Sequence, residues 1–509
     1  MKTEKESILR DPVRAVMNWA PARAARLILG AVICLCFFLY LTGQYSEYPG
    51  TAVIALAGTA SLAVMLAFAW RPAKEKPLIV LLVMAFALVM AVMAHYSLLD
   101  RSLGRMTKVL TPLADTLWNY DLNVAMSWEE GYWSAGYLIV MSLFSRLENF
   151  SLLYAVKLLD LVCLSLAACA VSCLAKRRGA GVMGQFGAML AAMLLPTMLL
   201  NGGLWAHCDA IFAMLTLWGL YMLLSDRPLA GSLLWGAAIA FKLQSAFVFP
   251  LAIVLFMKRK MGLRHIAAIF LAFLVFHIPM LMNGQSLPEV LDRYNKQILI
   301  TSYGEDYFTA SDEETDEEAQ EAEAQEAEQA DTADSAEETA DSAAADIPTH
   351  SELAEHAASV YSLMSVASVR EFSGMGLYLG IACALAVVFA LLRSRRELTA
   401  DVLLTAAFLL ACGLPLILPQ SNARFLYLAG LLSLPRVNSR LRLAEACGLE
   451  LISICCYVSA IFSTDAAPLS ILPDSVLSLI GIVIACAAAW ELFCALTGRN
   501  LKGHVHEQA

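Results

Sequence analysis

Three short polar sequences interrupt long apolar runs of this chain: HCD at 207–209, KLQ at 242–244 and NAR at 422–424. An imidazole can donate a hydrogen bond or shuttle a proton, a carboxylate can accept a proton, and an ammonium or guanidinium can bind an anion. Each of these groups is expensive to bury in apolar surroundings without a partner. The three sequences are therefore candidates for a functional site if the fold brings them together.

Each candidate also has a purely structural explanation. Asp209 stands at the expected start of a helix, where the helix dipole favours an acid. His207 could hydrogen-bond a ligand hydroxyl, shuttle a proton or serve as a plain polar contact. Lys242 and Gln244 are the strongest functional candidates, since an unpaired ammonium at membrane depth is costly.

The composition places these residues in a membrane protein. Of the 509 residues, 59% are hydrophobic and only 16% are charged, and the mean hydropathy is +0.65. Runs of about 20 apolar residues, enough to cross a bilayer as a helix, recur along most of the chain. We predict an all-α, polytopic helical bundle with 13 to 14 spans and no nucleic-acid partner. A soluble nucleotide-sugar enzyme is disfavoured because no Rossmann-type glycine fingerprint is present.

The predicted helices follow these apolar runs. They are 27–42, 51–70, 78–96, 152–175, 181–200, 208–224, 229–242, 244–257, 263–283, 376–392, 399–418, 424–436, 443–463 and 475–497. Lys157 and Asp160, three residues apart in one of them, could form a buried ion pair.

Five segments make up the predicted organisation. A basic leader, 1–26, precedes two extra N-terminal spans, 27–70. A central region, 78–437, carries all three polar sequences, and C-terminal spans, 443–497, lead to a tail, 498–509.

The Lys and Arg distribution predicts the orientation. If the N-terminus is cytoplasmic, 25 of the 35 basic residues fall on the cytoplasmic side, as the positive-inside rule requires. Both termini are then cytoplasmic, in a cell membrane. Residues 136–147 lie on the outer face without crossing, and 229–257 form two short helices with FKLQ, 241–244, at their outer apex.

With this topology, the unusual polar groups gather on the outer side. They are Asp100, Glu129, Glu130, His207, Asp209, Lys242, Gln244, Tyr294, Gln297, Gln420, Asn422 and Arg424. Two long outer loops, 97–133 and 284–374, accompany them. The second contains the tract 311–346, which has 16 acidic and no basic residues. Such a tract cannot bury an apolar face, so we expect a solvated insert or, alternatively, a cation-binding or partner-binding tract.

The cysteines give little sign of a metal. Twelve of the 13 lie in apolar runs and none forms a CxxC pair, so they are expected to be small core residues. Cys208 beside His207 is weak evidence for a metal ligand pair. No metal site is predicted, and a divalent cation remains open as a cofactor.

The polar sequences and their neighbours resemble a known family of membrane enzymes. NGGLWAHCDAIF (201–212), FKLQ (241–244), YNKQ (294–297) and LPQSNARFLYL (418–428) are similar to blocks of the bacterial relatives of the second mannosyltransferase of GPI-anchor synthesis, in the GT-C class. The matching positions are Trp205, Asp209, Phe241, Lys242, Leu243, Gln244, Pro419, Arg424 and Tyr427. The chain departs from the pattern at Ala206 and His207, where Gly and Gln are usual, and at Asn422 and Ala423, where His and Glu are usual.

The resemblance implies a GT-C-like fold and a glycosyltransferase. Such enzymes move a sugar, here a mannose-like hexose, from a polyprenyl phosphate to an acceptor hydroxyl outside the cytoplasm; the acceptor could be a glycan, a lipid or a protein. A carboxylate of the first outer loop acts as general base, which implies Asp100, although this residue could instead pair with Arg101 or Arg105. Cationic groups are needed at the leaving phosphate.

The other implied roles follow residue by residue. Lys242, Gln244 and Arg424 would bind the donor phosphate, with Arg424 suited to it by its bidentate fork. The implied substrate contacts are Trp205, His207, Asp209, Tyr294, Gln297 and Asn422.

Two other classes of protein stay open. A polyprenyl-lipid flippase or transporter would also have many spans and buried polar groups, together with inverted repeats and interrupted helices. A non-catalytic GT-C-like scaffold is favoured by the departures at Asn422 and Ala423.

Overall fold

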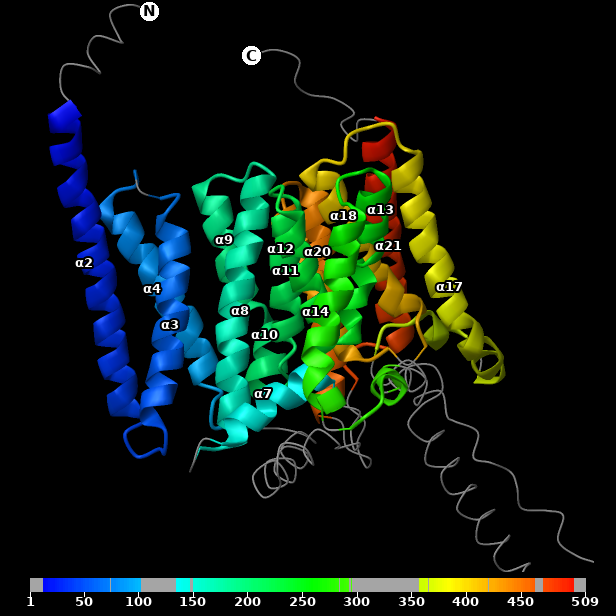
Figure 1. Ribbon diagram of the computed structural model, residues 1–509, viewed down its shortest axis with the longest axis horizontal. Coiled ribbons are helices and arrows are strands. Elements are labelled where there is room, and N and C mark those ends of the chain that lie inside the picture. The colour runs from blue at the N-terminus through cyan, green and yellow to red at the C-terminus, as the bar shows by residue number, and fades with distance from the viewer. Residues whose placement is uncertain are drawn as a thin grey trace, which may run out of the picture.

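The computed structural model describes most of the chain between residues 12 and 498. The described residues are 12–73, 75–101, 134–146, 150–282, 284–292, 294, 357–364, 366–419, 421–462 and 470–498, with the side chains of 12–23 and 366–374 excepted. All regular structure in these ranges is helical. The all-α polytopic bundle predicted from composition is therefore confirmed (Figure 1).

Nine helices in the described ranges have a segment long and apolar enough to cross a membrane. They are α2 (Pro12–Gln44), α3 (Thr51–Trp70), α4 (Leu78–Tyr96), α8 (Leu152–Arg177), α14 (Leu263–Met282), α17 (Val366–Arg393), α18 (Ala400–Ile417), α20 (Arg440–Phe462) and α21 (Asp474–Thr497). A tenth span results if the bent pair Val182–Leu194 and Pro196–Leu204 is counted as one.

The remaining described helices are shorter, and those within 182–204, 210–223, 228–257 and 423–436 stand where further spans were predicted. They are α7 (Ala135–Ser145), α9 (Val182–Leu194), α10 (Pro196–Met198), the π-helix η2 (Leu199–Leu204), α11 (Ala210–Leu223), α12 (Pro228–Phe241), the 3-10 helix η3 (Leu243–Val248), α13 (Pro250–Met257), η4 (Val360–Leu363), η5 (Ala423–Leu426), α19 (Tyr427–Ser433) and η6 (Leu434–Arg436). The continuous helix predicted for 424–436 is thus wrong in detail. A short α-helix lies there between two 3-10 turns, the second of which contains Pro435.

The helices alternate in direction between two faces of the bundle (Figure 1). We call the end at which α2 begins and α21 ends the terminal face, and the other end the opposite face. The turn between α13 and α14 lies at the terminal face. α7 lies obliquely at the opposite face, and its 11 residues, about 16 Å at 1.5 Å per residue, are too short to cross a bilayer. This arrangement agrees with the predicted threading; which face is cytoplasmic stays a prediction.

α8 is the central helix of the core. In its most apolar window 78% of the residues are buried, compared with 11% in α2 at the edge. It packs against α3, α9 and α11. The predicted ion pair of Lys157 with Asp160 is wrong: the Lys157 ammonium donates to the carbonyls of Leu98 and Leu99, and an Asp160 oxygen accepts from the backbone N–H of Ala210.

A charge network, buried except at the 40% exposed side chain of Asp401, joins five elements near the terminal face. Its members are Arg178, Asp401, Arg436, Arg442, Glu445 and Glu491. Arg442 donates both terminal guanidinium nitrogens to the Asp401 carboxylate, at 2.9 and 3.1 Å, and its Nε donates to Glu491 at 2.9 Å. Arg178, Arg436 and Arg442 are among the 25 basic residues predicted to be cytoplasmic, and all three have carboxylate partners within the chain.

Arg436 is the most enclosed cation of that network. Its side chain is 1% exposed and contacts Glu445 at 3.1 Å and Glu491 at 2.8 Å. Its guanidinium carbon lies 4.0 Å from the centre of the Phe408 ring. The contact ties η6 to α18, α20 and α21.

Candidate functional site

The three polar sequences meet inside the bundle because several helices stop short of the opposite face. α11 and α12 have 14 residues each, which corresponds to about 21 Å of rise, roughly two thirds of a hydrocarbon core. Their terminal-face ends are joined by the turn at 224–227 (Figure 1). Asp209 directly precedes the other end of α11, and Lys242 directly follows the other end of α12. Both of these helix ends therefore lie at membrane depth.

The chain reaches Asp209 through a tight, irregular turn. Pro196 ends α9 with a 41° bend, and η2 places Gly202 against α8. A side chain at Gly202 would collide with the Asp160 carboxylate, so only glycine fits there. Ala206 has φ +58°, a left-handed conformation that favours glycine.

The Asp209 carboxylate is held by two side chains. It forms an ion pair with the Lys242 ammonium, and its other oxygen accepts a 3.0 Å hydrogen bond from the Asn201 amide. That amide also donates to the Tyr457 hydroxyl oxygen at 2.8 Å. Asp209 is 4% exposed. Two of the predicted site residues therefore form a neutralised pair at the centre of the site, with Asp209 buried and the Lys242 side chain 23% exposed.

His207 and Arg424 form the second contact. An Arg424 terminal nitrogen lies 3.0 Å from His207 Nδ1. Because a guanidinium only donates, Nδ1 must accept, and a neutral His207 then carries its proton on Nε2. The Trp205 ring packs edge-on against His207, and the Arg424 guanidinium lies over it, with its carbon 5.7 Å from the ring centre. This contact joins the predicted residues of the first and third polar sequences.

Several buried polar atoms of this site have no hydrogen-bond partner in the described part of the chain. They are Asp160 Oδ2, Asn201 Oδ1, Gln244 Oε1, Arg424 Nε and the Tyr427 hydroxyl. Buried polar groups in proteins are nearly always paired, so each such atom calls for a water, an ion or a ligand. Arg424 also has no carboxylate partner there. The site thus offers both donors and acceptors to a polar, anionic ligand.

Asn422 and Tyr294 position the backbone of the site. The Asn422 side chain accepts from the backbone N–H of Arg424 at 3.1 Å and so caps η5. The Tyr294 hydroxyl donates to the carbonyl of Ala240 at 2.9 Å, and Ser134 donates to the carbonyl of Phe241 at 2.6 Å. These bonds fix the end of α12, after which Lys242 takes an extended conformation.

Asp100 lies apart from this cluster. It is exposed, just beyond α4, and accepts a 2.8 Å hydrogen bond from the Tyr154 hydroxyl. Asp100 is linked to the site only through the chain, since Leu98, two residues before it, packs against Gly203 of η2. The sequence predicted a single outer cluster, whereas the structure places Asp100 at the rim and Asp209 with Lys242 inside.

Comparison with protein-family models finds none that matches the chain, and comparison with curated proteins finds no match. The resemblance therefore stays a prediction. Gln297, Gln420, Glu129, Glu130 and the tract 311–346 lie outside the described residues.

Sequence reasoning missed Asn201 and Tyr457 as members of the site. Asn201 stands in the quoted NGGLWAHCD stretch, and its position six residues before His207 was the available signal. Tyr457 lies 256 residues further along, in an ordinary apolar helix, and no local pattern marks it. Within the described ranges, no three His, Cys, Asp or Glu side chains are grouped as a metal site would require.

Proposed function

We propose that the protein is an integral membrane glycosyltransferase that moves a hexose from a polyprenyl-phosphate donor to an acceptor hydroxyl. The observation that carries the proposal is the Arg424 guanidinium beside His207, Trp205 and the Asp209–Lys242 pair. It donates to His207, but in the described part of the chain it has no carboxylate partner and its Nε has no hydrogen-bond partner. A lipid-linked sugar phosphate supplies what these groups lack. It has an anionic phosphate for Arg424 and hydroxyls that both donate and accept.

The proposed reaction assigns a role to each group. The acceptor oxygen attacks the anomeric carbon while the bond from that carbon to the phosphate oxygen breaks, and the phosphate leaves with the bonding electrons. Asp100, which retains acceptor capacity beside its bond from Tyr154, takes the proton of the acceptor. Arg424 stabilises the charge that grows on the phosphate.

Lys242 and His207 serve the donor less directly. One Lys242 proton is committed to Asp209, and an ammonium has two others to donate. The Nε2–H of His207 is a donor for a sugar hydroxyl. Trp205 supplies a flat apolar surface beside it.

The test is transfer of radiolabelled sugar by protein reconstituted in nanodiscs, with a panel of polyprenyl-phosphate sugars. We expect one donor to support transfer, and Asp100→Asn and Arg424→Ala each to lower it at least about 100-fold, in the range seen for loss of a catalytic base or a charge-stabilising donor. Asp226→Asn and Arg395→Ala make the same changes at exposed positions near the terminal face and should leave transfer unchanged.

Failure of every donor to support transfer by folded wild-type protein would contradict catalysis. If Asp100→Asn retained full transfer activity while Arg424→Ala lost it, the protein would still be an enzyme, but Asp100 would not be its general base.

One observation favours a second candidate, a transporter of the same lipid class. The bent pair of α9 with α10 and η2 is an interrupted helix, and transporters place such helices around substrates near the bilayer midplane. A flippase would move a fluorescent polyprenyl phosphate across a vesicle without consuming it, and would retain that activity in Asp100→Asn.

A further inference from the structure

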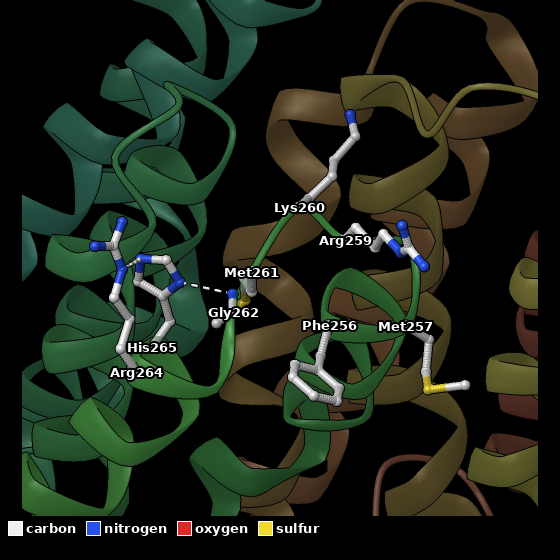
Figure 2. Close-up of a pocket in the computed structure, with 8 residues that line it drawn as sticks. All are labelled: Phe256, Met257, Arg259, Lys260, Met261, Gly262, Arg264 and His265. Atoms are coloured by element: carbon white, nitrogen blue, oxygen red, sulfur yellow. Dashed lines mark hydrogen bonds between the residues drawn. The ribbon is translucent and has the colours of Figure 1, made fainter.

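A second cationic site lies at the terminal face, where α13 turns into α14. The turn encloses an open hollow of about 580 Å³, lined by Phe256, Met257, Arg259, Lys260, Met261, Gly262, Arg264 and His265 (Figure 2). Three of the lining residues are cations and none is an acid. α13 separates this turn from η3 and the candidate functional site.

The three cations have no carboxylate partners in the described part of the chain. No Asp or Glu occurs anywhere in residues 250–282. In Figure 2, Arg259 and Arg264 lie on opposite sides of Met261 and Gly262, and Lys260 extends away from the helices. Three cations within residues 259–264 repel one another, and an anion bound at the turn would reduce that repulsion.

The backbone holds Arg259 where a glycine is usual. Arg259 has φ +59°, and the N–H of Lys260 donates to the carbonyl of Leu255 at 2.9 Å. This is the left-handed position of a Schellman turn, normally occupied by glycine because side chains are strained there. The turn therefore carries a cation at a conformational cost that glycine would avoid.

Two apolar residues next to the cations in the sequence, Met257 and Leu263, are exposed. Met257 is 60% exposed and Leu263 is 74% exposed. Both flank the turn at the ends of membrane helices, where exposed apolar side chains meet acyl chains. The turn thus combines three cations with exposed apolar side chains at the ends of two apolar helices.

We propose that this hollow, lined by Arg259, Lys260 and Arg264, binds the headgroup of an anionic phospholipid, with its acyl chains against Met257 and Leu263. His265 stiffens the site, since its Nδ1 accepts from the N–H of Gly262 at 2.8 Å. A soluble phosphate would satisfy the cations but would leave the apolar rim uncovered. The site is independent of the glycosyl transfer proposed above.

The first experiment measures binding of phosphatidylglycerol and phosphatidylcholine to delipidated protein by native mass spectrometry. We expect phosphatidylglycerol to bind at least tenfold more tightly, and Lys260→Gln with Arg264→Gln to abolish that preference. The control pair, Arg395→Gln with Arg440→Gln, removes two exposed cations outside the hollow, one just after α17 and one at the start of α20, and should retain that preference. An equal loss in both pairs would reduce the effect to general surface charge and overturn the site.

Arg259→Gly separates binding from folding. Glycine suits the left-handed turn, so lipid-free protein should melt no lower than wild type, yet its stabilisation by phosphatidylglycerol should fall. Unchanged stabilisation would exclude Arg259 from the site. Competition of inorganic phosphate with the lipid at equal concentration would overturn the lipid as occupant in favour of a soluble anion.

Discussion

The ion pair of Lys242 with Asp209 is the central contact of the candidate site at the scale of single residues. Removing one member leaves the other buried and unpaired, which costs about 3 to 5 kcal/mol. We expect Lys242→Met to lower the free energy of unfolding by about that amount, measured by chemical denaturation in micelles. Adding Asp209→Asn should recover part of the loss. A double variant that loses the sum of the two single effects would show that the pair is not coupled.

At Ala206 we expect a substitution to stabilise the protein. Its left-handed conformation is strained for any residue with a Cβ, by about 1 to 2 kcal/mol, while glycine costs about 0.5 to 1 kcal/mol in the unfolded chain. Ala206→Gly should therefore stabilise the protein by about 0.5 to 1 kcal/mol in the same unfolding measurement. Ala210→Gly, in the first turn of α11, is the control and should destabilise by about 1 kcal/mol. Destabilisation by Ala206→Gly would refute the strained turn.

At the scale of elements, the close approach of η2 to α8 depends on Gly202. A methyl group there would collide with the Asp160 carboxylate, so we expect Gly202→Ala to destabilise by about 1 to 3 kcal/mol, the usual cost of overpacking. Gly187→Ala, on α9 with open space around it, should instead stabilise by about 0.5 to 1 kcal/mol. If the melting temperatures of both variants shifted in the same direction, the close packing of Gly202 against Asp160 would be contradicted.

Hydropathy predicted most helices, because apolar runs of sufficient length specify membrane helices almost directly. Hydropathy failed where caps, proline or hydrogen bonds to distant residues determine the local structure. The segment 424–436 was predicted as one helix, yet η5 begins with the Asn422 cap and Pro435 lies in η6. Lys157 was predicted to pair with Asp160, three residues away, but its ammonium donates instead to the carbonyls of Leu98 and Leu99, just beyond the end of α4.

The same reasoning placed the site only in part. Residues 207–209, 242–244 and 422–424 stand out locally because charged groups are rare in apolar runs, and the structure brings them together. The pairing of Asn201 with Tyr457 spans 256 residues. A pattern within one segment cannot reveal such a contact.

At the scale of the whole molecule, the charge network around Arg436 fastens the C-terminal helices to the rest of the bundle. Arg436→Leu would leave Glu445 without its cation and would remove one of the two arginines that contact Glu491. We therefore expect the free energy of unfolding to fall by about 3 to 5 kcal/mol. The measurement is the melting temperature in detergent. Arg440→Leu, an exposed neighbour, should stay within about 0.5 kcal/mol of wild type. Equal melting of the two variants would mean that the network adds nothing.

Because α11 and α12 are too short to cross the membrane, binding of a charged ligand at the site should depend on the transmembrane voltage. Their ends lie about two thirds of the way across the hydrocarbon core, so a charge that enters from the opposite face crosses roughly one third of any transmembrane voltage. At about 2.3 kcal/mol per charge for 100 mV across the full membrane, that passage is worth roughly 0.8 kcal/mol. Occupancy of the Arg424 position by a monovalent anion would thus change about fourfold per 100 mV, which makes the energised state of the membrane a determinant of ligand affinity.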